Sequence, residues 1–318
     1  RLISVTTPSK PVADRVVELT AAGKPVRPSD VDAIRVDLVN LLAPETEPPK
    51  MPTGRYLFCG DVHMHTFYSD GQPSPVGLAL QTMYCFMDFN VLTDHNTIEG
   101  ARVGQQLLKD YGFAHPFTIG EEITTDWAHL NAYPLKQVVS WRLSPYDTIK
   151  AAHVQGAVIH WCHPYAISSK WADPLMETGI AGTGLDAWEH IPRTYDAWKK
   201  AGTLPVLVGS TDSHSGTFTQ APERTIIFAP TAQGDDLAEA IRSGHTVLVA
   251  WKAQNLFYGA DDMLALAWAA LAEGEALKTA KAECLRNVLK EADLAGMLLA
   301  SPPRPESLEE LSVSGISH

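Results

Sequence analysis

Short continuous apolar runs alternate along the chain with segments whose apolar residues have helical spacing. Continuous apolar runs are typical of strands covered on both faces, as in parallel sheets. The predicted strands are Tyr56–Val62, Phe89–Thr93, Phe117–Ile123, Leu130–Tyr133, Ala157–Trp161, Leu185–Trp188 and Val206–Gly209. The predicted helices between them are Pro75–Phe86, Ile98–Asp110, Ser144–Gln155, Thr194–Ala201 and Asp235–Ser243. This alternation predicts an α/β fold built on a parallel sheet or barrel.

The same pattern divides the chain into three parts. Residues 1–54 are expected to form a leader, which ends in a group of prolines that interrupt regular structure before the first strong strand. Residues 55–250 contain the strand–helix alternation and are expected to form the main domain. Residues 251–318 are rich in Ala, Leu, Glu and Lys and predict a helical C-terminal segment, with helices at Asp261–Ala272 and Ala276–Leu299. We expect this segment to pack on the main domain or on a partner subunit, so a homo-oligomer is compatible with the sequence.

Composition narrows the classes of partner. The 318 residues are 45% hydrophobic and 19% charged, which is enough apolar material for a large core and argues against disorder. A net charge of −12, from 25 basic and 37 acidic residues, argues against binding to duplex nucleic acid. A small phosphorylated substrate remains compatible, because bound cations reverse the local charge. No apolar run approaches the roughly 18 residues of a membrane span, so no membrane partner is expected. The chain starts at Arg1, which leaves a cleaved signal peptide open, although a cytoplasmic location is favoured.

Polar side chains with metal-binding or acid–base capacity follow almost every predicted strand. His63 and His65 are two residues apart, so on an extended segment both would point to the same face. Asp70 follows them after a short loop. The later candidates are His95, Glu122, His129, His163, Asp212 and His214. The carboxyl ends of parallel barrel strands form one rim, so we expect these groups to meet in one pocket.

Six imidazoles and three carboxylates, with no thiolate among them, suit divalent zinc, manganese or iron. Nine ligands are enough for two ions, or for three if a carboxylate bridges. Such centres lower the pKa of a bound water and stabilise a developing oxyanion. Each motif alone is weak evidence, since Asn96 or Thr97 could simply cap the helix that follows. Their joint order and their positions after strands favour the metal interpretation.

As a set, these motifs resemble those of the PHP (polymerase and histidinol phosphatase) superfamily. The matching strings are Gly60–His65 with Ser69–Gly71, Leu92–Asn96, Gly120–Ile123, His163–Pro164 and Gly209–His214. Within the superfamily the chain is similar to the branch that contains carbaryl-type carbamate hydrolases. That similarity rests on Glu189, Trp198, Glu223–Thr225 and Ala240–Gly244.

The resemblance implies a distorted (β/α)7 barrel with a dinuclear or trinuclear centre. It places His63, His65, Glu122 and Asp212 around one ion, and Asp70, His95 and His214 around a second. Glu122 would bridge to a third ion held by His129 and His163. The implied activity is hydrolysis of phosphate mono- or diesters, with carbamate hydrolysis as a side branch.

Three functions follow from these observations. The first is a metal-dependent phosphoesterase, in which a metal-bridging hydroxide attacks phosphorus and His214 or Asp70 passes a proton to the leaving group. The second is hydrolysis of a carbamate, ester or amide on the same centre. The third is a non-catalytic metal-binding module that serves assembly.

Three more residues are candidates for substrate binding. Arg224 has the geometry to hold an anion by paired hydrogen bonds, although an ion pair on the domain surface is an alternative. Arg193 lies on a predicted rim loop. His190 stands where family members often have Asn, so we expect it to shape substrate preference.

Overall fold

The computed structural model describes residues 55–84, 87–110, 112–166, 175, 178–215, 223–250 and 257–272. The predicted leader at 1–54 and the predicted helix at 276–299 lie outside the described residues. The strands are β1 (Tyr56–Asp61), β2 (Phe89–Leu92), β3 (Phe117–Ile119), β4 (Glu121–Thr124), β5 (His129–Tyr133), β6 (Val158–Trp161), β7 (Ala187–Glu189), β8 (Leu207–Val208), β9 (Glu223–Ala229), β10 (Thr246–Ala250) and β11 (Phe257–Tyr258). The helices are α3 (Pro75–Tyr84), α4 (Glu99–Asp110), α5 (Pro145–Val154), α7 (Tyr195–Ala201), α8 (Gly234–Arg242) and α9 (Asp261–Ala272).

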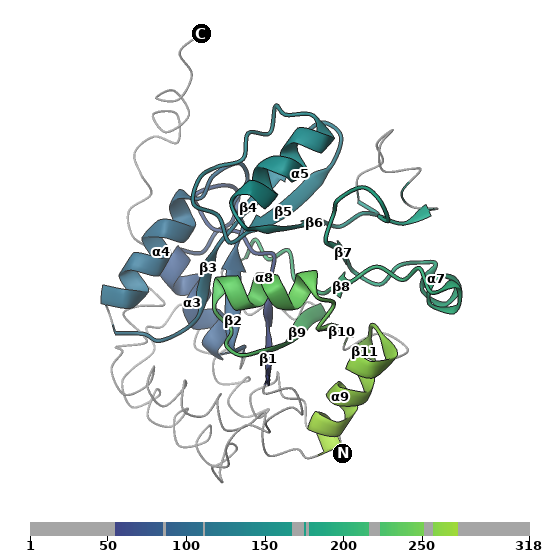
Figure 1. Ribbon diagram of the computed structural model, residues 1–318. Helices are drawn as coiled ribbons and strands as arrows, with labels where there is room; N and C mark the ends of the chain where they lie inside the picture. The colour runs from purple at the N-terminus through teal and green to yellow at the C-terminus, as the bar shows by residue number, and fades with distance from the viewer. Residues whose placement is uncertain are drawn as a thin grey trace.

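The strands form two mixed sheets (Figure 1). The first has the order β11-β10-β9-β1-β2-β3, with parallel pairs at β1–β2 and β2–β3 and antiparallel pairs elsewhere. The second has the order β4-β5-β6-β7-β8, in which β5 is antiparallel to both of its neighbours and the remaining pairs are parallel. The α/β class is therefore confirmed. The described strands do not form the single closed parallel barrel that the sequence led us to expect.

The first interruption lies at Gly120, where one predicted strand becomes two. A Cβ on Gly120 would lie 2.8 Å from Val91 Cγ1 and 2.9 Å from Thr93 Cγ2, so the chain passes too close to β2 for a side chain. The segment before it pairs with β2, and the segment after it pairs with β5. Hydrophobic pattern alone does not report this change of partner, because both halves are buried.

The second interruption lies between β8 and β9. Here the two sheets are linked through a side chain, since the Thr225 hydroxyl donates to the Gly209 carbonyl (2.7 Å) and accepts from the Gly209 N–H (2.9 Å). Beyond β8 the chain continues with β9 and β10, which pair antiparallel and were not among the predicted strands. Helix α8 lies between β9 and β10, yet the two strands pair antiparallel, so the expectation that a helix connects parallel strands does not hold here.

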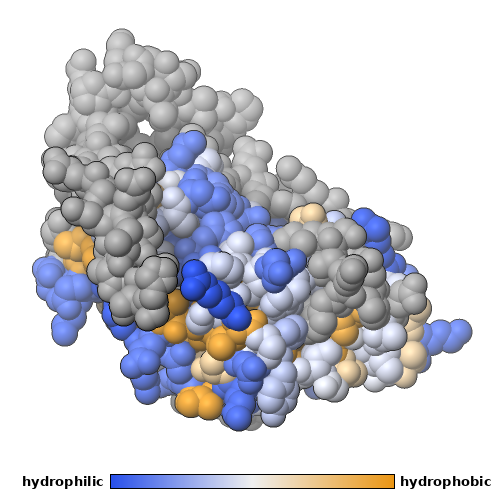
Figure 2. Space-filling model, turned by 90° about the horizontal axis from the view of Figure 1, so that it is seen from above, coloured by the Kyte–Doolittle hydropathy of each residue, from blue (hydrophilic) through white to orange (hydrophobic). Residues whose placement is uncertain are grey.

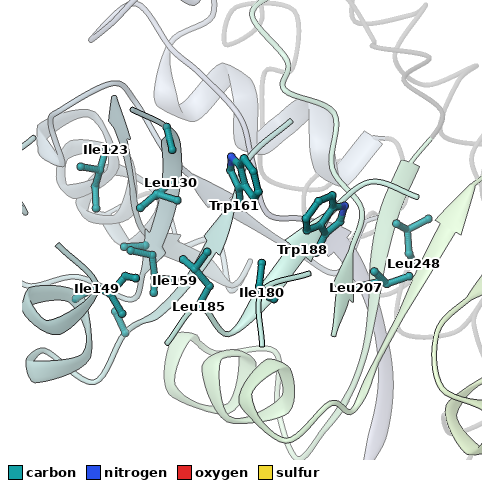
Figure 3. Packing of buried hydrophobic residues seen from close by; sticks show 14 of the residues in the cluster. Ile123, Leu130, Ile149, Ile159, Trp161, Ile180, Leu185, Trp188, Leu207 and Leu248 are labelled. Carbon is teal, nitrogen blue, oxygen red and sulfur yellow. The ribbon is translucent and has the colours of Figure 1, made fainter. Parts of the chain in front are cut away.

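Both sheets contribute to shared apolar packing. One cluster contains Phe89 and Ile227 from the first sheet with Val158 and Val208 from the second, and α8 closes it with Leu237. A second and larger cluster lies along β4 to β8 (Figure 3). In Figure 3, Trp161 and Trp188 lie next to each other, and their ring centroids are 5.2 Å apart. The two sheets are thus held against a common interior even though their ladders are not continuous.

The helices cover the outside of this strand assembly. In Figure 1, α3 and α4 lie beside β2 and β3, α5 lies over β6, and α9 lies near β10 and β11. On the face shown in Figure 2, hydrophobic residues occur as small patches among hydrophilic ones. Among the described helices, none has both the length and the apolar character needed to cross a bilayer.

Candidate metal centre

The nine predicted metal-binding residues gather at one edge of the strand assembly. His63 and His65 follow β1, His95 follows β2, and His163 follows β6. Asp212 and His214 follow β8, while Glu122 lies within β4. His129 is the first residue of β5, but β5 runs antiparallel to β4 and pairs His129 with Thr124, so it reaches the same edge. Residues from both sheets therefore converge, as the strand-end pattern predicts.

Glu122 is fully buried at the middle of the group, and its two oxygens face different imidazoles. Its Oε1 lies 2.7 Å from His129 Nδ1 and 3.1 Å from His163 Nε2. Its Oε2 lies 3.1 Å from both His63 Nε2 and His65 Nε2. A carboxylate placed between separate sets of imidazoles has the position that a bridging ligand needs.

The most buried set consists of His63, His65, Glu122 and Asp212, whose donor atoms all lie within 4.8 Å of one another. His63 Nε2 and His65 Nε2 are 3.0 Å apart. Asp212 Oδ1 lies 3.3 Å from the first of these nitrogens and 3.1 Å from the second. These atoms therefore face a common point.

A second set surrounds Asp70 and is more open to solvent. Asp70 Oδ1 lies 3.1 Å from His214 Nε2, and Asp70 Oδ2 lies 3.4 Å from His95 Nε2. His65 completes this set, with donor atoms again within 4.8 Å. The side chains of Asp70 and His214 are 56% and 38% exposed, so this side of the centre faces the solvent.

The backbone is strained where several of these side chains leave their strands. Among the described residues, the non-glycine positions with positive φ are Asn96, His163, His190 and Asp212. His163 and Asp212 belong to the cluster. Asn96 follows His95, and His190 follows Glu189, which contacts His63. Such conformations cost on the order of 1–3 kcal/mol and persist where the surroundings enforce them, often at functional sites.

The electrostatics of the cluster are strongly coupled. Burial opposes protonation of His63, but the carboxylates of Glu189 and Glu122 outweigh it and raise the pKa of His63 well above its usual value. Burial alone would raise the pKa of Glu122, but the facing imidazoles, led by His63, hold it far below the usual range. Asp212 behaves in the same way, since its contacts with His65 and His63 outweigh burial and lower its pKa. The electrostatics thus favour ionised carboxylates beside protonated His63 and His65, since the pKa of His65 is also raised.

This donor set fits divalent metal ions. Metal binding to imidazole and carboxylate releases protons, so cations would replace the protons that balance the buried carboxylates. His65 Nδ1 is buried without a hydrogen-bond partner and lies 3.8 Å from Asp70 Oδ1. Imidazole and carboxylate suit zinc, manganese and iron, as the sequence predicts.

Two buried carboxylates around the centre were not among the predicted site residues. Glu189 Oε1 lies 2.9 Å from His63 Nδ1. Asp61 Oδ1 accepts from the backbone N–H groups of His63 and Thr211, which ties the end of β1 to the segment after β8. Both residues end their strands, which is the same signal that identified the other candidates.

Asp94 precedes His95 in the sequence, but its carboxylate contacts the segment that follows His65. Its carboxylate accepts from the Thr66 N–H (2.7 Å), the Thr66 hydroxyl (2.6 Å) and the Ser69 hydroxyl (2.8 Å). Asp94 therefore holds the loop that carries Asp70. His95 Nδ1 instead contacts the Thr124 hydroxyl.

The three predicted substrate-binding residues lie in different environments. Arg224 is buried, and its charge opposes the rise that burial causes in the pKa of Asp61. His190 is half-buried, with Nδ1 2.7 Å from Glu223 Oε2. The Arg193 guanidinium lies 4.5 Å from the centroid of the Tyr165 ring. A contact of any of them with substrate stays a prediction.

Comparison with known proteins shows which solved structures have a similar fold. No family model matches the chain. An uncharacterized protein of Methanocaldococcus jannaschii is 29% identical in an alignment of 134 positions that covers 38% of this chain and 77% of that protein.

A crystal structure from Bacteroides vulgatus is similar in fold, with a TM-score of 0.54 and 20% identity over 70% of this chain and 73% of the other. It is described as a two-domain protein containing a predicted PHP-like metal-dependent phosphoesterase. A proposed metal-dependent phosphoesterase from Bifidobacterium adolescentis has a TM-score of 0.41 and 17% identity over 62% of this chain and 98% of the other.

Proposed function

We propose that this chain is a metal-dependent hydrolase of the PHP type that cleaves phosphate mono- or diesters. The observation that carries the proposal is the position of Glu122, whose two oxygens face separate groups of imidazoles contributed by both sheets. The motifs and the fold similarity to the Bacteroides vulgatus structure support the same class. Two or three zinc, manganese or iron ions would be held by the nine donors named above.

Bound ions would supply Lewis-acid activation of water and charge stabilisation for the ester oxygens. The chain contributes the geometry for this chemistry. Burial of Glu122, His63 and His65 excludes bulk water from one side of the centre. The exposed side carries Asp70 and His214, so we assign the approach of substrate to that side. Either of these two residues is placed to pass a proton to the leaving group.

A carbamate, ester or amide would be hydrolysed by the same donor set and is the alternative substrate class. The similarity of Glu189 and Glu223–Thr225 to the carbaryl-hydrolase-like branch favours this alternative. The expected partner in both cases is a small molecule, and a homo-oligomer is part of the same proposal.

The test is hydrolysis by metal-free protein reloaded with Mn²⁺ or Zn²⁺. We expect turnover of p-nitrophenyl phosphate or bis(p-nitrophenyl) phosphate, and loss of that turnover in His65→Ala. Turnover of a naphthyl carbamate or naphthyl acetate without phosphoesterase activity would assign the alternative. Metal binding without turnover of either class would indicate the non-catalytic module. Less than one equivalent of bound metal after loading would contradict all three.

A further inference from the structure

Glu189 is a buried carboxylate at the centre that the proposed ligand set does not use. It ends β7 and has no exposed surface. Its Oε1 lies 2.9 Å from His63 Nδ1 and accepts a hydrogen bond from the Ser210 hydroxyl. Its Oε2 accepts from the backbone N–H of His163. One carboxylate therefore contacts segments that follow three different strands.

We propose that Glu189 is a positioning residue that fixes the orientation of two metal ligands, His63 and His163. The proposal rests on the metal centre of the proposed function. A hydrogen bond from Nδ1–H to Glu189 leaves the Nε2 lone pair of His63 free to face the centre. Without the carboxylate, the ring can place its proton on Nε2 instead, where the proton blocks ligation.

The contact with His163 acts on the backbone. His163 has a φ of 26°, a conformation that L residues rarely adopt. The hydrogen bond from its N–H to Glu189 holds the peptide in this conformation, which directs His163 Nε2 to within 3.1 Å of Glu122 Oε1. Glu189 thus aligns a ligand from the first sheet with a ligand from the second.

Further polar residues support Glu189 from behind. His160 Nε2 lies 3.7 Å from Glu189 Oε1, and His160 Nδ1 lies 3.2 Å from the hydroxyl of Tyr133. Both residues are fully buried. This chain of contacts reaches from the centre into the core and limits the rotation of the Glu189 side chain.

A different role is also conceivable from geometry alone. His63, Cys162 and Glu189 each offer a donor atom within 4.8 Å of the others, which would make Glu189 a ligand. Both oxygens of Glu189 already accept hydrogen bonds from protein groups, and His63 would have to present Nδ1 rather than Nε2. Positioning therefore accounts for more of its contacts than ligation does.

The test is a Co²⁺ titration of the full chain, followed by visible absorption, with bound metal counted by elemental analysis. In Glu189→Gln, an amide NH₂ must face either the His63 side or the His163 N–H. Loss of an outer carboxylate partner typically lowers metal affinity about 10- to 100-fold. We expect a loss of that size, an altered Co²⁺ spectrum and an unchanged number of ions at saturation.

The matched control is Glu121→Gln. Glu121 is equally buried in β4, but its carboxylate accepts a hydrogen bond from the backbone N–H of Val139. A glutamine oxygen can still accept this hydrogen bond. We expect Co²⁺ affinity within about twofold of wild type. Ser210→Ala removes one hydrogen bond to Glu189 while leaving the carboxylate, and we expect a smaller loss of affinity than in Glu189→Gln. This second variant tests the proposal if Glu189→Gln fails to fold by circular dichroism.

Wild-type affinity and spectrum in Glu189→Gln would overturn the inference while leaving the proposed function intact. A saturated variant with one ion fewer than wild type would also overturn it, because Glu189 would then be a ligand. A wild-type chain that binds no Co²⁺ would overturn both proposals together.

Discussion

At the scale of single residues, the centre depends on buried carboxylates that contact imidazole side chains. A buried carboxylate is costly unless it is paired and hydrogen-bonded. Glu122 and Glu189 are both fully buried and both meet imidazole nitrogens within 3.1 Å. Substitution of Glu122 or Glu189 therefore alters the hydrogen bonds and the electrostatic environment of several neighbouring groups at once.

The first prediction concerns Glu122. Glu122→Gln replaces one oxygen with an NH₂ group that cannot bind a cation, so one set of imidazoles loses its shared ligand. We expect metal affinity to fall by more than about 100-fold, since even loss of an outer-layer partner costs 10- to 100-fold. Isothermal titration with Zn²⁺ measures this, with Glu121→Gln as the matched control. Equal affinity in the two variants would remove Glu122 from the centre.

A second prediction concerns His115, which is buried and contacts Thr82 and Asn90. Burial lowers the pKa of His115 to about 3. The unfolded chain gains a proton on this residue near its ordinary pKa of about 6.5, while the folded chain does not. Stability from neutral His115 is therefore fully present above pH 6.5 and is lost as the pH falls from 6.5 towards 3.

His115→Gln removes this titration, while the glutamine NH₂ can still donate to Asn90 Oδ1, which His115 Nε2 contacts at 2.8 Å. Urea unfolding of metal-free protein at pH 7 and pH 5 measures the effect. We expect wild type to lose on the order of 1–2 kcal/mol more than the variant over this interval. Parallel losses in the two proteins would show that His115 does not contribute to acid destabilisation.

At the scale of elements, the changes of strand partner determine which side chains reach the centre. The chain changes its strand partner at Gly120, after which β4 pairs with β5. This pairing brings Glu122 and His129 to one edge. The Gly120 N–H still donates to the Leu92 carbonyl of β2 at 3.0 Å, so the two sheets remain joined at this point. A side chain at residue 120 would separate them.

The prediction at this scale is that Gly120→Ala destabilises the fold. Its Cβ would meet Val91, Thr93 and the Ala132 carbonyl at 2.8, 2.9 and 3.2 Å. Overpacking of this kind typically costs about 1–3 kcal/mol. Thermal unfolding of metal-free protein measures the loss. The control is Gly77→Ala in α3, whose Cβ would meet only the Ser74 hydroxyl, at 3.0 Å. A melting temperature for Gly120→Ala at or above that of the control would contradict the prediction.

Most of the elements were predictable from periodicity, but their pairing was not. Apolar runs located β1, β2, β5, β6, β7 and β8 to within a few residues, and helical spacing located α4, α5 and α8 equally well. Apolar runs also exist at β9 and β10, yet strand–helix alternation favoured a parallel arrangement that they do not follow. A strand's partner and direction depend on contacts between distant residues, which local pattern does not record.

The site was predictable to a greater extent than the sheet that carries it. Most of the nine residues were selected because they follow strands, whose carboxyl ends meet at one edge where the strands are parallel. His129 reaches the same edge because it begins β5, which runs antiparallel to β4. Supporting residues were harder to find. Asp94 was identifiable as polar and buried, but only the fold shows that it holds the Asp70 loop.

At the scale of the whole molecule, the donors are divided between the two sheets. His63, His65, Asp70 and His95 follow strands of the first sheet, and the others follow or belong to strands of the second. Between the sheets, backbone hydrogen bonds such as those from the His65 N–H to the Ser213 carbonyl and from the Asn96 N–H to the Glu122 carbonyl add to the contacts of Thr225 with Gly209. Bound ions would add bonds across this boundary.

The prediction at this scale is that metal ions stabilise the fold. A ligand that binds only the native state stabilises it by about 2.7 kcal/mol at 100 times its dissociation constant. We expect metal-free protein to melt at a lower temperature than protein loaded with Zn²⁺ or Mn²⁺, measured by differential scanning fluorimetry. Ca²⁺ is the control, because it prefers all-oxygen sites and six of the nine donors are imidazoles. An equal shift with Ca²⁺ would indicate nonspecific binding to acidic surface groups.

The division of donors between the sheets also bears on how the protein is made. The first four donors leave the ribosome well before Asp212 and His214, which are separated from His95 by more than a hundred residues. A nascent chain that stops short of β8 lacks two of the nine donors and cannot complete the cluster. Metal binding at the complete cluster would therefore come late in biosynthesis. It requires that both sheets have been translated and have folded against each other.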